Sequence, residues 1–120
     1  ERGMGVVVIR VMAGGALGGP AARTGHAAPT VGGAMVSGGE YNADGARARK
    51  LEFLTTGDAS SLPQAAVCFA LGHAGASTVL VGFSDVAQIE EATACSGKSS
   101  LPETAMERLR GLWATDFWSG

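Results

Sequence analysis

Gly5-Val-Val-Val-Ile9 and Ser77-Thr-Val-Leu-Val-Gly82 are the two stretches that decide the fold of this 120-residue chain. Both are short, continuous and rich in β-branched side chains, with no alternation of polar and apolar residues. This pattern is typical of a strand that is covered on both faces in a parallel sheet. We therefore predict strands over residues 5–9 and 77–82, and the sequence offers no third strand of similar quality.

Helical spacing of apolar residues predicts four helices between and after these strands. Their expected ranges are 41–55, 61–72, 85–95 and 101–117. In the second helix, Ala66, Phe69 and Ala70 are expected to form the buried stripe. The order of elements, with helices between and after two parallel strands, predicts an α/β fold.

Two of the helix starts carry the signature of a capping box. In Ser61-Leu-Pro-Gln64, the serine hydroxyl is expected to accept a hydrogen bond from the Gln64 amide, with the proline in the first turn. Ser100-Leu-Pro-Glu103 repeats this arrangement. The helix at 85–95 is expected to begin with Ser84 or Asp85 as its N-cap.

Glycine is concentrated in the first part of the chain, where 12 of the 19 glycines lie between Gly3 and Gly45. Few large side chains accompany them, so we predict a glycine-rich loop over residues 13–40. His26 lies in this loop, and no neighbouring residue is an obvious partner for it.

A sheet of two parallel strands is incomplete. It leaves two unpaired edges, needs cover on both faces, and is too small to be stable by itself. We therefore expect further strands, supplied either by sequence that precedes Glu1 or by a partner chain.

The charge balance excludes two classes of partner. The chain has 9 Lys and Arg residues against 11 Asp and Glu, for a net charge of −2, with no run of like charges. Nucleic acid and anionic membranes are recognised by clustered basic residues, so neither is expected as a partner. The most apolar stretch, residues 6–17, is interrupted by Arg10 and is too short to span a bilayer.

The two cysteines, Cys68 and Cys95, lie in apolar, helix-like contexts and show no metal-ligand spacing. We expect reduced, buried thiols, no disulfide and no metal site. This usage of cysteine, together with the absence of a visible secretory signal, indicates a cytoplasmic protein.

The loop after the second predicted strand is a candidate phosphate site. Gly82 allows another molecule to approach the backbone, and the helix that follows begins with free amides and a partial positive charge. The simpler interpretation is that Ser84 or Asp85 only caps the helix, and the negative charge of Asp85 disfavours an anion there.

The stretch from Arg10 to Gly19 follows the first predicted strand and is rich in small residues, as close contact with a cofactor requires. A dinucleotide-binding fold of Rossmann type is disfavoured, because G-x-G-x-x-G is absent and no acidic residue ends a second strand about 20 residues later. Arg10 suits either a phosphate or a structural ion pair.

The remaining candidates have ordinary structural interpretations. His73 is expected to cap a helix end, and Tyr41 is expected to pack or to cap. Trp113, Phe117 and Trp118 form an apolar patch that suits a core or an interface.

Taken in order, three segments resemble the carboxyl-terminal third of the aldo-keto reductases. These are Gly3 to Leu17, Ala65-Ala-Val-Cys-Phe-Ala-Leu71, and Val79-Leu-Val-Gly-Phe-Ser-Asp-Val-Ala-Gln-Ile-Glu-Glu91. The stretch from Leu101 to Trp113 is similar to the last helix of that family. The resemblance covers essentially the whole chain, and the loop at 18–39 matches least.

The resemblance implies a TIM (β/α)8 barrel of which residues 1–120 form the last two strand-helix units, strands seven and eight. Loops after these strands commonly bind phosphate in such barrels. In this family they hold NADPH, the first near the diphosphate and the second around the adenosine. By position, the diphosphate would be contacted by Arg10, Met12 and Gly14, and the adenosine by Gly82, Phe83, Ser84, Gln88 and Glu91.

The chain departs from the family pattern at three places. Arg10-Val11-Met12 stands where Ser-Pro-Leu is common, and Ala92 replaces an Asn that usually contacts adenine. The segment 83–85 has no basic residue to meet a 2′-phosphate, so both NADP and NAD remain open as the cofactor.

The family's catalytic Asp, Tyr, Lys and His lie on earlier strands, and none maps onto this chain. The resemblance therefore implies a fragment of an NAD(P)H-dependent oxidoreductase that reduces an aldehyde or ketone, or oxidises the alcohol, and that is inactive alone. The isolated chain is expected to bind NADPH weakly or not at all. The alternative is a non-catalytic nucleotide-binding or interaction module that assembles with another chain.

Overall fold

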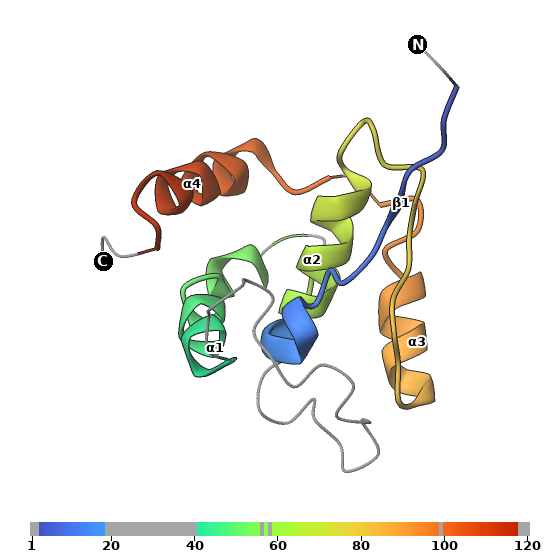
Figure 1. The fold of residues 1–120 in the computed structure, drawn as a ribbon, viewed down its shortest axis with the longest axis horizontal. Helices are drawn as coiled ribbons and strands as arrows, with labels where there is room; N and C mark the ends of the chain where they lie inside the picture. The colour runs from blue at the N-terminus through green and yellow to red at the C-terminus, as the bar shows by residue number, and fades with distance from the viewer. Residues whose placement is uncertain (1–2, 19–40, 56, 58, 99, 118–120) are drawn as a thin grey trace.

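A computed structural model describes residues 3–18, 41–55, 57, 59–98 and 100–117 (Figure 1). The predicted loop beyond residue 18, with His26, and Trp118 at the other end lie outside the described residues. In chain order the elements are strand β1 (Val7–Val8), the 3₁₀ segment η1 (Ala13–Gly18), α1 (Tyr41–Arg49), the 3₁₀ turn η3 (Glu52–Thr55), α2 (Leu62–Leu71), β2 (Thr78–Val79), α3 (Val86–Thr93) and α4 (Glu103–Ala114).

The two strands pair in parallel, which confirms the predicted arrangement and places the described chain in a loosely α/β, helix-dominated class. Val7 lies opposite Thr78, and Val8 lies opposite Val79. The ladder is shorter than the predicted 5–9 and 77–82. At its end Arg10 adopts a left-handed φ of 61°, which turns the chain away from the sheet and leaves β2 without a partner beyond Leu80.

The prediction of one continuous helix over 41–55 is wrong. After α1 the backbone changes to i→i+3 bonds, from Lys50 N to Arg47 O at 3.0 Å and from Leu51 N to Ala48 O at 2.9 Å. This tighter winding ends the helix at Arg49, and η3 then brings Leu54 into the buried core.

The capping box at the start of α2 is confirmed. The Ser61 hydroxyl accepts a hydrogen bond from Gln64 N at 3.2 Å. The Gln64 side-chain oxygen closes the box one residue earlier than the usual pattern, accepting from Ser60 N at 3.0 Å. The helix ends at Leu71, with Gly72 as its C-cap.

The second predicted capping box, at Ser100–Glu103, is wrong. α4 begins at Glu103 after Pro102, and no side chain caps it. Ser100 lies against Gly72 instead, and the Glu103 carboxylate pairs with Arg110 at 2.6 Å. The helix also ends earlier than the predicted residue 117, because Asp116 and Phe117 adopt left-handed φ angles of 48° and 64°.

Helix α2 lies at the centre of the molecule, between the strands and α3 on one side and α1 and α4 on the other (Figure 1). The buried cluster gathers around it and consists of Leu54, Ala59, Ala65, Val67, Cys68, Cys95, Leu101 and Leu109. The predicted stripe is only partly correct, because Ala70 is buried whereas Ala66 is half-buried and Phe69 is exposed. The buried face of α2 is therefore rotated toward α3.

Candidate site at the carboxyl ends of the strands

Two loops leave the sheet at the same end. Because β1 and β2 are parallel and in register, Ile9 and Leu80 follow the ladder at neighbouring positions. The chain then continues into η1 on one side and into the start of α3 on the other, and both run toward the bottom of Figure 1. The crevice outside the carboxyl ends of parallel strands is where open α/β sheets usually bind ligands.

The first loop holds strained backbone. Arg10 and Ala13 have left-handed φ angles of 61° and 49°, and Gly14 and Gly15 follow with 66° and 97°. A left-handed non-glycine residue costs about 1–2 kcal/mol, and such residues cluster at functional sites. Turn hydrogen bonds hold this conformation, from Ala13 N to Arg10 O at 3.1 Å and from Gly15 N to Met12 O at 2.9 Å.

The predicted contacts of the first loop separate into two groups. Arg10 is exposed, and it forms no ion pair with any residue that the structure describes. Met12 is half-buried and packs against the hydrophobic core. Its side chain therefore serves packing, whereas Arg10 and the backbone at Gly14 remain at the surface of the loop.

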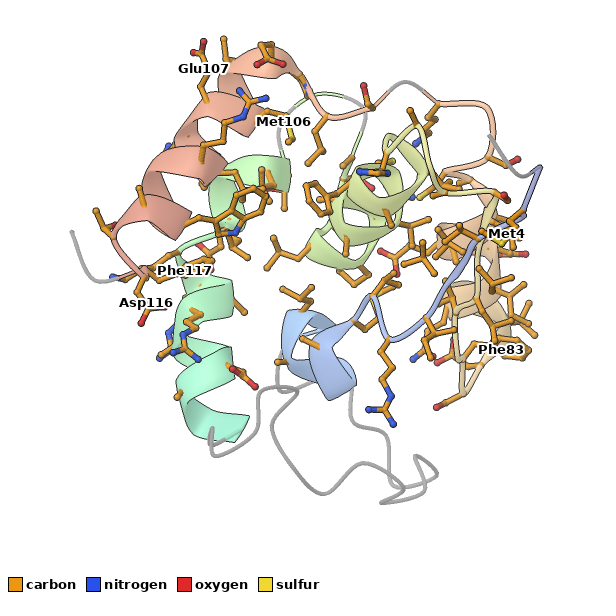
Figure 2. All side chains as sticks on the ribbon, turned by 45° about the horizontal axis from the view of Figure 1, so that its top comes forward. Met4, Phe83, Met106, Glu107, Asp116 and Phe117 are labelled. Atoms are coloured by element: carbon orange, nitrogen blue, oxygen red, sulfur yellow. The ribbon has the colours of Figure 1, made fainter. Side chains whose placement is uncertain are left out.

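The second loop is open. A Cβ at Gly82 would meet no atom within 4 Å, and the Phe83 side chain is 61% exposed. Figure 2 shows Phe83 beside the strands, on the side of the molecule away from Phe117 and the end of α4. An incoming molecule therefore meets an accessible backbone next to an exposed aromatic ring.

The start of α3 is capped by its own residues. The Asp85 carboxylate accepts from Gln88 N at 2.9 Å, and the Gln88 side-chain oxygen accepts from Ser84 N at 2.7 Å. Of the two expected N-caps, the structure forms the one at Asp85. The side chain of Gln88 is thus engaged in capping, which sequence spacing alone did not indicate.

Glu91 joins α3 to α2. Its carboxylate accepts a hydrogen bond from the Ser61 hydroxyl, and its backbone oxygen accepts from the Gln64 side-chain amide at 3.2 Å. Of the eight predicted cofactor contacts, the surface of the two loops therefore carries Arg10, Gly14, Gly82, Phe83 and Ser84, whereas Met12, Gln88 and Glu91 make contacts within the chain.

A second feature was missed by sequence reasoning. A half-open cavity of about 920 Å³ is lined by residues of β1, α2 and α4, among others. Phe69 and Trp113 meet across it edge to face, with ring centroids 5.9 Å apart. Its lining is mostly apolar, and Phe117 of the predicted apolar patch belongs to it. The helical spacing of apolar residues predicted that Phe69 would be buried in the core. No sequence signal indicated that a cavity would lie beside it.

His73 and Cys95 have structural surroundings. The expected cap by His73 is wrong: Gly72 is the C-cap of α2, and the His73 Nδ1 accepts a hydrogen bond from Gly75 N at 3.1 Å in the turn that follows. Burial raises the pKa of the Cys95 thiol to about 11, with a further contribution from a hydrogen bond with Cys68. Both cysteines are free, and neither lies in the two loops.

Within the described ranges, no three His, Cys, Asp or Glu side chains are grouped so as to hold a metal ion. No helix in the same part of the chain has the length and apolar character needed to cross a membrane. Comparison with family models, with curated proteins and with solved structures gave no match to this chain.

Proposed function

We propose that this chain is the cofactor-side end of an aldo-keto reductase barrel and that its two strands are the last two of the cylinder. One observation carries the proposal: β1 and β2 are parallel neighbours, and each is followed at its carboxyl end by a loop that exposes cofactor-compatible groups. In (β/α)8 barrels, the loops after the last two strands frequently form a phosphate site.

The residues present fit a dinucleotide only in part. Arg10 supplies a cation without a described ion-pair partner, Gly82 allows backbone approach, and the Phe83 ring offers a flat apolar surface for a base. No basic side chain in segment 83–85 would meet a 2′-phosphate, so the proposal is for NADP with NAD as the other possibility. When bound, the cofactor would supply a hydride, and these residues would bind and orient the cofactor.

The exposed face of the sheet supports a larger assembly. Val7, Ile9 and Leu80 are 56%, 58% and 65% exposed, although a parallel sheet normally has cover on both faces. We propose that further strand-helix units, upstream of Glu1 or on another chain, cover this face and bring the catalytic Asp, Tyr, Lys and His. The completed cytoplasmic protein would reduce an aldehyde or ketone, and this chain alone would not.

The test is a titration of the ¹⁵N-labelled chain with NADPH and NADH, followed by amide chemical shifts. Saturation only at about 1 mM or above, a free energy of about −4 kcal/mol or weaker, is expected because half the pocket is missing. The shifts should be confined to the exposed positions of the two loops, which are Arg10, Gly14, Gly82, Phe83 and Ser84, and Arg10→Met should weaken them. Shifts confined to other residues, or saturation at about 1 μM cofactor, would contradict the proposal that these loops form one half of a cofactor pocket.

The alternative function is a non-catalytic nucleotide-binding or interaction module. The apolar cavity beside α4 and the exposed strand face favour it, because both are surfaces that a partner chain can cover. The reading frame before the codon for Glu1 separates the two proposals. Six strand-helix units with the four catalytic residues support the reductase, whereas a start codon near Glu1 supports the module.

A further inference from the structure

Two cysteines from different helices meet in the core. Cys68 lies on α2 and is 3% exposed, and Cys95 lies just beyond α3 and is 1% exposed. Both belong to the same buried cluster, and both thiols are free. Neither residue takes part in the proposed cofactor site.

The contacts of Cys95 place its sulfur beside Cys68. The Cys95 Sγ lies 3.6 Å from the backbone oxygen of Gln64, which is one helical turn before Cys68. Side chains on a helix lean toward its N-terminus, over the residue four positions earlier, so the Cys68 side chain covers the same turn. Cys68 is also one of the groups that raise the pKa of Cys95, which agrees with this placement.

We propose that Cys68 and Cys95 form an intramolecular oxidation site, in which a peroxide closes the two thiols into a disulfide between α2 and the end of α3. One thiolate attacks a peroxide oxygen, the O–O bond breaks, and hydroxide leaves as the sulfenic acid forms. The second thiolate attacks that sulfur, forms the S–S bond and displaces hydroxide. The two thiol protons end in two water molecules, and the peroxide is reduced.

The burial of the pair determines when this reaction occurs. The thiolate is the reactive form, and a pKa of about 11 leaves little of Cys95 ionised near neutral pH. Peroxide also has to reach sulfurs that are almost fully covered. Disulfide formation is therefore slow while α3 stays packed against α2. It proceeds when the two helices separate transiently, and the disulfide then links them covalently.

The ring that the disulfide closes contains β2, the loop at Gly82 and α3. Oxidation therefore fixes the helix that follows the second candidate loop. The site does not depend on the proposed function, because the chemistry needs only the two thiols and the measurements below involve no nucleotide.

The experiment treats the reduced, folded chain with hydrogen peroxide and follows intact mass and thermal unfolding. The expected product has lost the mass of two hydrogen atoms, is monomeric, and contains a peptide pair linked through residues 68 and 95. Its melting temperature should rise by about 10 °C and return after dithiothreitol, since a cross-link of this span restricts the unfolded chain.

Cys68→Ser and Cys95→Ser should each abolish both the loss of two hydrogen atoms and the rise in melting temperature. If a buried serine hydroxyl prevents folding, Cys68→Ala and Cys95→Ala replace these variants in the same measurement. The native thiols should react with a soluble disulfide reagent at least about 100-fold more slowly than the thiols of the denatured chain. Sulfinic acid as the main product, disulfide-linked dimers, or a lowered melting temperature after oxidation would overturn the proposal.

Discussion

Gly72 and Ser100 approach each other so closely that no side chain fits between them. A Cβ on Gly72 would lie 2.6 Å from the Cβ of Ser100 and 3.3 Å from its Cα. This contact is where the segment leading into α4 crosses the end of α2. The backbone of Gly72 is right-handed, with φ of −68°, so the reason for glycine here is space rather than conformation.

Gly72→Ala should destabilise the chain by about 1–3 kcal/mol, because the segment at Ser100 must move to admit the methyl group. The matched control is Gly111→Ala in α4, where a Cβ would meet no atom within 4 Å. That change should stabilise the chain by about 0.5–1 kcal/mol, because alanine has a higher helix propensity than glycine. Urea unfolding of both variants measures the difference, and equal effects would show that the contact with Ser100 does not matter.

Leu109→Ala should cost about 2–5 kcal/mol, since Leu109 is only 4% exposed and belongs to the core cluster. Leu80→Ala is its counterpart on the open face of the sheet, where the side chain is 65% exposed. The isolated chain should tolerate that change within about 0.5 kcal/mol. A large loss for Leu80→Ala would mean that the isolated chain covers this face itself.

Asp85→Asn should tighten NADPH binding about fivefold at low salt, because it removes one negative charge beside the second loop. Asparagine keeps the cap on α3, so the helix should persist. Asp85→Ala removes charge and cap together, and it should destabilise the helix by about 1 kcal/mol. Amide shifts give the affinity and urea unfolding gives the stability. If Asp85→Asn binds no better than the original chain, the anion does not lie near this helix start.

Stability should fall as the pH rises from about 9 to about 11. The pKa of Cys95 is raised from 9.0 to about 11, chiefly by burial, so the folded state favours the neutral thiol. A group whose pKa is higher in the folded than in the unfolded state contributes its full stabilisation at a pH below its unfolded pKa. This stabilisation is lost as the pH rises through the folded pKa. Cys68 and Glu91 raise this pKa further, and Lys98 lowers it. Cys95→Ala should flatten the curve, and an unchanged slope would assign the loss to other groups.

The sequence predicted correctly those strands and helix caps that depend on residues close to one another in the chain. The valine runs located both strands and their parallel pairing, and the caps at Ser61 and Asp85 follow from residues three positions apart. The cap expected at Ser100 failed because a tertiary contact with Gly72 takes its place. Nothing in the spacing around Glu91 showed that its carboxylate would accept from Ser61 on another helix.

The sheet has one further practical consequence. Within the described residues β1 and β2 have only each other as neighbours, so each presents an outer backbone edge. An extended peptide with β-branched residues can add to such an edge by main-chain hydrogen bonds. A short synthetic valine-rich strand would thus serve as a reversible affinity handle for purification. We expect the same edge to favour association of the isolated polypeptide at high concentration, and lysine substitution along the edge should reduce it.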